Sequence, residues 1–352
     1  MNLPVGPPLP PMLARLAREL PTGDFFFEPK WDGFRCLAFR AGDEVDLRSR
    51  HDRPLARYFP EVVEALRRLP AARFALDGEL VVLRRSGFDF PSLMARLHPA
   101  PTRVERLRRE TPALLIAFDL LSLGDDDLRA RPFAERRRLL EEVVAPDASG
   151  VFLTPLTADP SIAATWLARF AGAGIDGVVA KGRAAEYVPG SRTMVKVKPE
   201  RTADCVVAGF RWLVHRALPS SLLLGLYDEA RLHHVGVVSS FTGHQRERLL
   251  EVLRPLVVEL AGHPWEHGFL VEGGATGRLL GAAGRWTPDM VRDWVPVAPR
   301  LVCEVAYDQL DGRRFRHPAR FRRWRPDREP ASCGFDQLQV APADIGQLLA
   351  AA

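Results

Sequence analysis

The sequence predicts an α+β protein made of two domains. Apolar runs of strand length, interrupted by a few helical patterns, fill the first 200 residues. The pattern breaks at Pro199-Glu200-Arg201-Thr202, and beyond it short strands with a single helix fill the rest of the chain. We therefore expect residues 1–200 to form one domain with antiparallel sheets and residues 201–352 to form a small β-barrel.

Apolar spacing and turn residues place the elements of the first domain. Residues 36–39 and 45–47 are expected to pair as strands around Ala41-Gly42-Asp43, and Val62, Leu66 and Leu69 recur at helical spacing. Asp159 is a typical N-cap before a proline at the first helical position. The remaining expectations are a Pro-rich surface arm at 1–24, strands at 74–83, 114–121, 177–181 and 194–198, and helices at 132–144 and 160–170.

The second domain is built mainly from short strands. A helix is expected at 243–260, where Thr242 and Gln245 form a capping box. The Gly-rich stretch 268–284 is interpreted as a loop and not as a phosphate cradle, because it lacks the GxGxxG spacing. Strands are expected at 205–210, 222–227 and 232–238, and a hairpin is expected between 301–307 and 313–315. Such a set of strands with one helix is typical of a barrel of the oligonucleotide-binding type, or OB fold.

Composition describes a globular chain in a reducing compartment. The net charge of +5 and the pI near 9.3 permit a polyanionic partner without establishing one. The four cysteines form no CxxC pair, which disfavours a zinc ribbon or a disulfide framework. Neither a leader pattern nor an apolar run of about 18 residues is present. We expect a monomeric cytoplasmic protein without membrane contact.

Lysine is scarce, and its positions are informative. Of 49 basic residues only four are lysine, at Lys30, Lys181, Lys196 and Lys198. A GC-rich gene accounts for the excess of arginine but not for the places where lysine remains. Guanidinium stays protonated, whereas an amine can lose its proton and attack an electrophile. Lys30 is therefore the candidate nucleophile, although a solvated surface lysine is the commoner reading of one such residue.

The motifs around these lysines resemble those of the covalent nucleotidyltransferases, the superfamily of DNA ligases, RNA ligases and capping enzymes. The resemblance covers most of the chain, and the order and spacing of its motifs agree as well as their composition. More closely, residues 202–210 and 314–325 are similar to the small bacterial ATP-dependent DNA ligases of the ligase C kind. The motifs are Lys30-Trp31-Asp32-Gly33-Phe34-Arg35, Ser49-Arg50, Asp77-Gly78-Glu79, Phe118-Asp119, Asp176-Gly177-Val178-Val179-Ala180-Lys181, Lys196-Val197-Lys198 and Arg325-Pro326-Asp327-Arg328.

The resemblance implies a role for each motif residue. Lys30 would carry AMP on its amine, with Asp32 orienting it, and the backbone at Glu28 and Pro29 would help to read the adenine. Phe118 would stack on the base, although a phenylalanine in an apolar run is as often a core residue. The other nucleotide contacts implied by the resemblance are Arg35, Arg50, Glu79, Lys181, Lys196 and Lys198.

The resemblance also implies ATP and a divalent metal as cofactors. Asp176, with Glu79, would bind Mg²⁺ (or Mn²⁺), but Asp176 replaces the glutamate that is commoner in the superfamily, and the shorter side chain favours contact through water. Arg325 and Asp327 would orient the leaving pyrophosphate. Arg328 stands where the last motif usually ends in lysine, and its own role stays open.

The last motif lies in a basic segment. Residues 313–328 hold eight arginines and one acid, interleaved with Phe315, Phe321 and Trp324. A charge run is usually a solvated face, but arginines mixed with aromatics also contact phosphates and sugars. We expect binding to nicked duplex DNA without sequence preference.

The sequence thus predicts an ATP-dependent DNA ligase that seals nicks through a lysyl-AMP intermediate. The resemblance to ligase C proteins implies work in DNA repair, beside a repair polymerase. Two alternatives stay open at this point. One is an RNA ligase or a capping-type guanylyltransferase, and the other is a non-catalytic nucleic-acid-binding protein.

Overall fold

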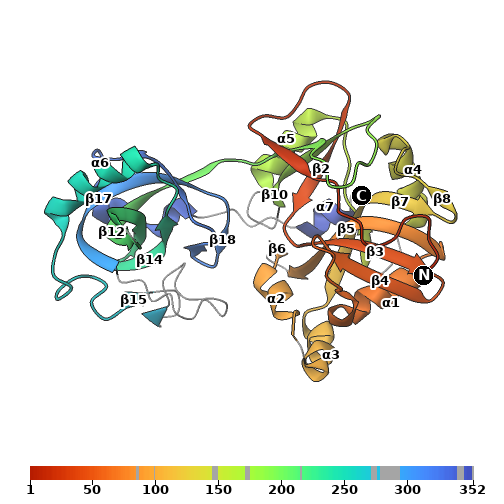
Figure 1. The fold of residues 1–352 in the computed structure, drawn as a ribbon, viewed down its shortest axis with the longest axis horizontal. Helices are drawn as coiled ribbons and strands as arrows, with labels where there is room; N and C mark the ends of the chain where they lie inside the picture. The colour runs from red at the N-terminus through yellow and green to blue at the C-terminus, as the bar shows by residue number, and fades with distance from the viewer. Residues whose placement is uncertain are drawn as a thin grey trace. The chain divides into compact units, whose positions relative to one another are not determined.

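The chain divides into two units, one holding Met1–Pro199 with Val340–Ala352 and the other holding Glu200–Gln339. The structure is a computed structural model, and Figure 1 shows it as a ribbon. Each unit is described by itself below. The residues that the structure describes are 1–84, 87–98, 100–144, 150–170, 175–214, 216–270, 276–277, 294–338 and 345–350.

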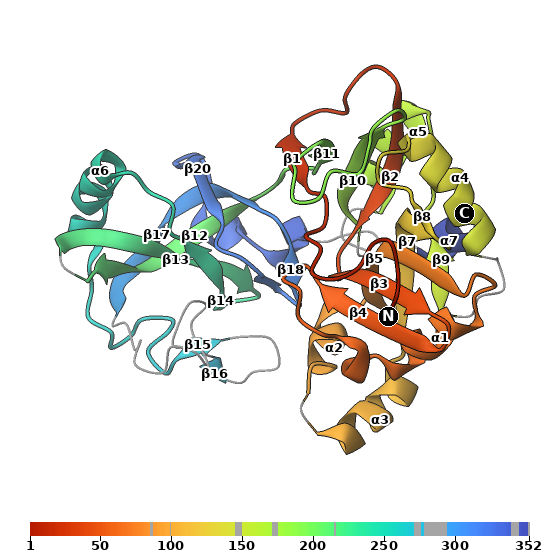
Figure 2. The same ribbon diagram turned by 45° about the vertical axis from the view of Figure 1, so that its right-hand side comes forward.

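Two sheets form the first unit, and Figure 2 shows them from a second side. One sheet has the strand order β1-β11-β10-β2, in which β1 (Ala14–Ala17) pairs parallel with β11 and the other pairs are antiparallel. The other has the order β4-β3-β5-β7-β8, with β6 and β9 paired to β5 and β7. The remaining bounds are β2 Phe25–Trp31, β3 Phe34–Ala41, β4 Glu44–Ser49, β5 Arg73–Arg84, β6 Gly87–Phe88, β7 Ala113–Leu123, β8 Asp126–Asp127, β9 Val151–Leu153, β10 Ile175–Gly182 and β11 Met194–Val197.

The larger sheet is covered on both faces because its strands are apolar on both sides. Cys36 and Ala38 of β3 belong to a core shared with α1 (Pro60–Arg68) and α4 (Phe133–Val143). Leu37 and Phe39 alternate with them and pack instead against the N-terminal arm. The other helices of this unit are α2 Phe90–Ala95, α3 Pro101–Glu110, α5 Pro160–Arg169 and α7 Ile345–Ala350.

The C-terminal helix α7 corrects the expectation that residues 201–352 belong entirely to the second domain. Ile345, Leu348 and Leu349 follow the spacing of one helical face and are buried in a core of the first unit. The same core contains Phe27 and Trp31 of β2. The chain therefore ends on the unit in which it begins.

The second unit is built around a curled sheet of order β14-β13-β12-β17-β20. An isolated parallel bridge joins Val238, at the end of β14, to Ala319, just before β20, so the two edges of the sheet meet as in a partly closed barrel. This confirms the expected α+β fold with a barrel domain. The bounds are β12 Arg201–Leu213, β13 Arg216–Asp228, β14 Arg231–Val238, β17 Trp294–Tyr307 and β20 Arg320–Trp324, with α6 Gly243–Leu253 beside them and the short pairs β15 Phe269–Leu270 with β16 Thr276–Gly277 and β18 Leu310–Asp311 with β19 Arg314–Phe315.

Two local predictions for the second unit differ from the structure. The capping box of Thr242 and Gln245 is present, but α6 ends at Leu253 because Pro255 follows in a short 3-10 turn. The hairpin at Asp311 joins β18 to β19, whereas β17 pairs with β12 and β20. Most of the Gly-rich stretch 268–284 lies outside the described residues. None of the helices that the structure describes combines the length and apolar composition needed to cross a bilayer.

Candidate active site

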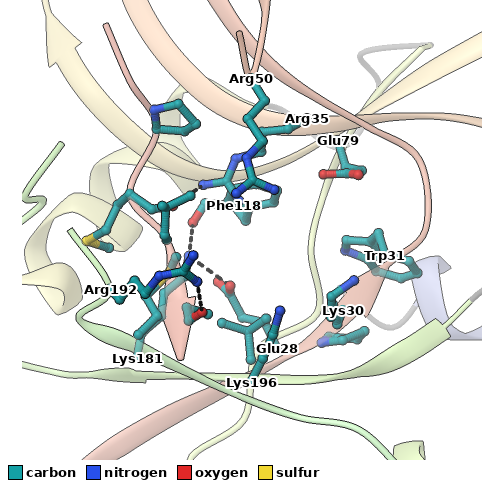
Figure 3. A pocket seen from close by; sticks show the side chains of 17 residues that line it. Glu28, Lys30, Trp31, Arg35, Arg50, Glu79, Phe118, Lys181, Arg192 and Lys196 are labelled. Carbon is teal, nitrogen blue, oxygen red and sulfur yellow. Dashed lines mark hydrogen bonds and ion pairs between the residues drawn. The ribbon is translucent and has the colours of Figure 1, made fainter. Parts of the chain in front are cut away.

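A pocket in the first unit brings most of the predicted site residues together (Figure 3). Its cavity measures about 200 Å³, and its lining comes from both sheets and from the N-terminal arm. The lining residues are Pro11, Met12, Leu13, Ala14, Glu28, Pro29, Lys30, Trp31, Arg35, Arg50, Glu79, Phe118, Val179, Lys181, Arg192, Met194 and Lys196.

Lys30 is presented by the end of β2 and the tight turn after it. The turn requires Gly33, because a Cβ there would lie 2.1 Å from the carbonyl oxygen of Leu80 on β5. Lys30 Nζ donates a hydrogen bond of 2.7 Å to Asp176 Oδ2, and its side chain is only 24% exposed. The KxDG motif thus fixes an amine at the pocket wall.

Asp176 lies between two lysine amines. Lys198 Nζ is 2.6 Å from the carboxylate oxygen that accepts from Lys30. Burial raises the pKa of Asp176, but the charges of Lys30 and Lys198 outweigh it and the pKa is lowered overall. The next residue has to be glycine, since Gly177 has φ of +150° and a Cβ would lie 2.2 Å from the carbonyl oxygen of Val197. Asp176 is therefore an anion held against the candidate nucleophile.

Glu28, Lys181 and Phe118 form a second part of the site. Lys181 Nζ lies 2.8 Å from Glu28 Oε2 and donates to the carbonyl oxygen of Phe118 at 2.8 Å. Glu28 is buried, and its Oε1 has no hydrogen-bond partner among the described residues. Burial raises the pKa of Glu28 against the charges of Lys181 and Arg137. A buried oxygen without a donor, on a residue that lines the pocket, is a place for a ligand donor.

Phe118 serves both the core and the pocket. Its ring is 8% exposed, belongs to an apolar cluster and also lines the cavity. The Arg35 guanidinium carbon lies 4.4 Å from the ring centroid. Phe118 is therefore a core residue that also lines the pocket, and its stacking on the adenine base stays a prediction.

Arg35 is oriented by a carboxylate that the sequence analysis named only as part of a motif. Its Nε and Nη2 donate to the two oxygens of buried Asp77 at 2.5 Å each. Tyr187 donates its hydroxyl to the same carboxylate at 2.6 Å. Burial lowers the pKa of Arg35, but the charge and hydrogen bonds of Asp77 raise it by more. The net effect is a raised pKa, so Arg35 stays protonated. The bidentate pair fixes the plane of the guanidinium above Phe118.

The remaining predicted residues differ in their surroundings. Burial raises the pKa of Glu79 to about 7, against the lowering effects of Arg35 and Lys30, and Glu79 Oε1 accepts from the backbone amide of Gly33 at 3.2 Å. Burial also lowers the pKa of Lys196, and the positive charges of Lys198 and Lys30 lower it further. Asp32 is half-buried beside Lys30.

Arg50 joins the pocket to a second, larger groove. This groove has a volume of about 700 Å³ and shares Arg35, Arg50 and Glu79 with the first pocket. Its other walls alternate basic and apolar side chains. They are Gly33, Phe34, Ser49, His51, Arg53, Pro54, Leu55, Arg57, Tyr58 and Leu97.

The described residues contain no ready-made cage of three or more metal-ligating side chains. Mg²⁺ usually keeps several waters and takes only one or two protein carboxylates together with substrate phosphates. Glu79 lines the pocket, and Asp176 lies just behind the lining, in contact with Lys30, so the two carboxylates fit that pattern. Asp176 would first have to exchange its lysine partners.

Arg325 and Asp327 form a separate cluster in the second unit. Arg325 Nε and Nη2 donate to Asp327, with the shortest contact at 2.7 Å. This hydrogen bonding lowers the pKa of Asp327 to about 2 and raises that of Arg325. Arg320, Arg322 and Arg323 of neighbouring β20 point at least partly to solvent, as a phosphate-binding surface requires.

Sequence reasoning missed several pocket residues. Met12 and its neighbours come from the N-terminal segment, which was expected only as a surface arm. Arg192 lies in a loop and is one of 45 arginines, so nothing in the sequence distinguishes it. Asp77 lies in an apolar strand, where a buried carboxylate needs polar partners. This was a reason to expect such partners, although the sequence did not identify Arg35 and Tyr187.

Two family models of known proteins match the two parts of this chain. The model of the ATP dependent DNA ligase domain matches residues 11–198, and that of the ATP dependent DNA ligase C terminal region matches residues 215–328. DNA ligase C of Mycobacterium tuberculosis is 47% identical over 96% of this chain and 96% of its own length. DNA ligase C2 of Mycolicibacterium smegmatis is 47% identical over 97% of both.

Solved structures agree at the level of the fold. A Lig E DNA ligase superposes with a TM-score of 0.53 at 16% identity, covering 89% of this chain and 99% of the other. The full-length match to ligase C proteins disfavours the RNA ligase, capping-enzyme and non-catalytic alternatives. The chain therefore belongs to the family of ATP-dependent DNA ligases, enzymes that use ATP and a divalent metal to join DNA ends.

Proposed function

We propose that Lys30 is the residue that takes AMP from ATP. The observation that carries this assignment is the clustering of an amine, a carboxylate pair and several cations around one pocket, with Lys30 at its wall. The amine attacks the α-phosphorus, a nitrogen–phosphorus bond forms, and the bond to the leaving pyrophosphate breaks. The amine also gives up a proton, so the ion pair with Asp176 must be exchanged before attack.

The later steps reuse the same centre. An oxygen of the DNA 5′-phosphate attacks the phosphorus of lysyl-AMP and frees Lys30. The 3′-hydroxyl then attacks the 5′-phosphate, closes the strand and releases AMP. Bound Mg²⁺, held by Asp176 and Glu79, would offset charge that builds up on the phosphates. Lys196 and Lys198 supply compact positive charge to the same oxygens.

Nucleotide choice is assigned to Glu28 and Phe118. Glu28 Oε1 accepts no hydrogen bond from the described residues, its ion-pair partner Arg137 Nη1 lying 4.0 Å away, so it suits the amino group of adenine, whereas guanine presents a carbonyl oxygen at that position. Phe118 offers a ring face whose position is fixed by Arg35 and Lys181. Lys181 contacts Glu28 and the carbonyl oxygen of Phe118 and also lines the pocket, so it would position both residues as well as contact the nucleotide.

DNA contacts are assigned to two surfaces. The groove at Arg50, Arg53 and Arg57 adjoins the nucleotide pocket and suits the phosphates of the strand ends. The exposed arginines of β20 suit the duplex backbone, and Arg325 with Asp327 would orient pyrophosphate. We expect the two units to close around the DNA, with the pivot at Pro199 and Glu200.

The cellular setting remains a prediction. All four cysteines are buried free thiols, which suits a reducing cytoplasm. Work in repair beside a polymerase follows from the likeness to ligase C proteins and can be tested by pull-down with a gap-filling polymerase. Light scattering tests the expected monomer.

The covalent step gives the decisive experiment. The protein is first treated with pyrophosphate to remove any bound AMP, then incubated with Mg²⁺ and ATP or GTP labelled at the α-phosphate. Label from ATP alone should remain on the denatured protein, and Lys30→Arg should abolish it while keeping the charge next to Asp176. Label retained on the variant would assign the nucleophile to another residue.

A further inference from the structure

Arg325 is fixed in place by a carboxylate outside its own motif. Its Nη1 donates to both oxygens of Asp204 at 2.9 Å each, while Nε and Nη2 donate to Asp327. Asp204 lies on β12, and Arg325 directly follows β20, which is separated from β12 by β17. The contact therefore reaches across β17 and connects the last motif, which follows β20, to β12.

Asp204 is itself rigidly held. Its backbone amide donates to Gln337 Oε1 at 2.8 Å, and Gln337 Nε2 donates to the Asp204 carbonyl oxygen at 3.2 Å. Its main chain is paired with Glu304 in the sheet, and its side chain is 13% exposed. Because the backbone of Asp204 is fixed on both sides and its side chain is mostly buried, its carboxylate can define where a partner side chain lies.

The arginines of this segment differ in how far they are buried and held. Arg325 is 18% exposed, whereas Arg320, Arg322 and Arg323 are 54%, 38% and 64% exposed. Arg328 shares the same anchor, because its Nε lies 3.3 Å from Asp204 Oδ2. The backbone amide of Arg325 donates to the carbonyl oxygen of Val302 at 2.8 Å. One arginine is thus held by side chain and main chain together.

Asp327 alone could not provide this orientation. Its side chain is 61% exposed and lies two residues from Arg325 on the same turn. A contact within one exposed turn moves with that turn, whereas Asp204 belongs to the sheet. Removing Asp204 would leave the Arg325 guanidinium paired only with Asp327, without a contact to the sheet.

We propose that Asp204 is a positioning residue for the adenylylation step, which presents the Arg325 guanidinium in the orientation needed to receive the pyrophosphate of ATP. This inference rests on the role proposed above for Arg325. It places a determinant of the first chemical step in the barrel unit, on a residue that touches neither ATP nor DNA. The same carboxylate also holds Arg328, which would be a second cation positioned by Asp204.

The test separates the first step from the last. Single-turnover transfer of labelled AMP to the protein is measured at saturating ATP, and sealing of a synthetic pre-adenylated nick is measured without ATP. Asp204→Ala should slow AMP transfer roughly 10- to 100-fold and leave sealing within about twofold.

Asp204→Asn preserves volume and one acceptor oxygen and should be intermediate, which guards against simple misfolding. Glu304→Gln is the matched control, since it removes the neighbouring 2.6 Å pair with Arg323 in the same sheet, and it should leave AMP transfer unchanged.

A double variant shows whether Asp204 acts through Arg325. The combined Asp204→Ala and Arg325→Ala variant should transfer AMP no more slowly than Arg325→Ala alone. Additive losses, equal losses in both steps, or normal AMP transfer by Asp204→Ala would overturn the inference. Normal transfer by Arg325→Ala would instead show that the proposed role of Arg325 is wrong, and the inference would fail with it.

Discussion

Glu79 lines the pocket, and burial brings its pKa to about 7, against 4.5 for a free glutamate. Below pH 4.5 the side chain is protonated in both the folded and the unfolded protein. As pH rises from 4.5 to 7 the unfolded state ionises first, so the folded state loses stability, and above 7 the loss is complete. Glu79→Gln should remove this loss and gain about 3 kcal/mol on the wild type between pH 5 and pH 8. Urea unfolding of both proteins at these pH values measures it, and parallel pH profiles would contradict it.

Glu28 gives a prediction about nucleotide choice. Glu28→Gln keeps an oxygen that can remain near Lys181 but changes the charge and donor pattern at the adenine position. ATP should bind roughly 10-fold more weakly, and the preference for ATP over GTP should shrink by at least the same factor. Competition of unlabelled GTP against labelled ATP in the AMP-transfer reaction measures the ratio. An unchanged ratio with weaker ATP binding would mean that Glu28 only supports Lys181.

At this scale the sequence predicted residues with distinctive chemistry. Lys30 stood out because lysine is rare in the chain, and Glu79 and Asp176 stood out through Asp-Gly motifs, which the structure explains by close backbone approach at Gly78 and Gly177. The role of Asp77 in holding Arg35 could not be derived, because it depends on pairing between β3 and β5. The assigned chemical roles still await measurement.

At the scale of elements, α7 packs in the same core as Trp31, a residue that lines the pocket. Leu348 is 7% exposed in a core that includes Trp31, the neighbour of Lys30. Leu348→Asp should destabilise the protein by about 2–4 kcal/mol, since a charge replaces a buried leucine, and should slow AMP transfer. Chemical denaturation and AMP labelling measure both effects.

A surface position on another helix provides the control for this change. Ile162 on α5 is 44% exposed, and Ile162→Asp should alter stability by less than about 0.5 kcal/mol. If the two variants behaved alike, α7 would not be docked on the first unit in solution.

Sequence patterns located the elements that carry their own signals. α1 contains Val62 and Leu66 of the predicted apolar spacing. The bounds of α4 and α5, each with a proline at or just before its start, agree with prediction to within one residue. α3 was missed because only Val104 and Leu107 of its ten residues are buried apolar side chains. β1 was missed because its partner β11 lies about 180 residues away, and no local pattern reports such pairing.

The whole molecule has to coordinate two units that each hold part of the predicted machinery. Lys30 and its pocket belong to the first unit, and Arg325 belongs to the second. The sequence predicted the break between the two domains at residues 199–202 from composition. In the structure Arg201 already begins β12 and pairs with Tyr307, which leaves Pro199 and Glu200 as the candidate pivot.

Stiffening this pivot tests whether the units move during the reaction. Glu200→Pro would place two prolines in succession, which restricts the backbone of residue 199 to extended conformations. We expect repeated nick sealing with ATP to slow several-fold, because in the mechanism proposed above the second unit approaches ATP and then withdraws in each cycle. Glu200→Gln is the matched control, since it too removes the ion pairs of Glu200 with Arg320 and Arg322 but leaves the backbone free. Stopped-time assays of AMP transfer, DNA adenylylation and strand closure would locate the slow step, and equal rates for both variants in all three steps would show that the pivot lies elsewhere.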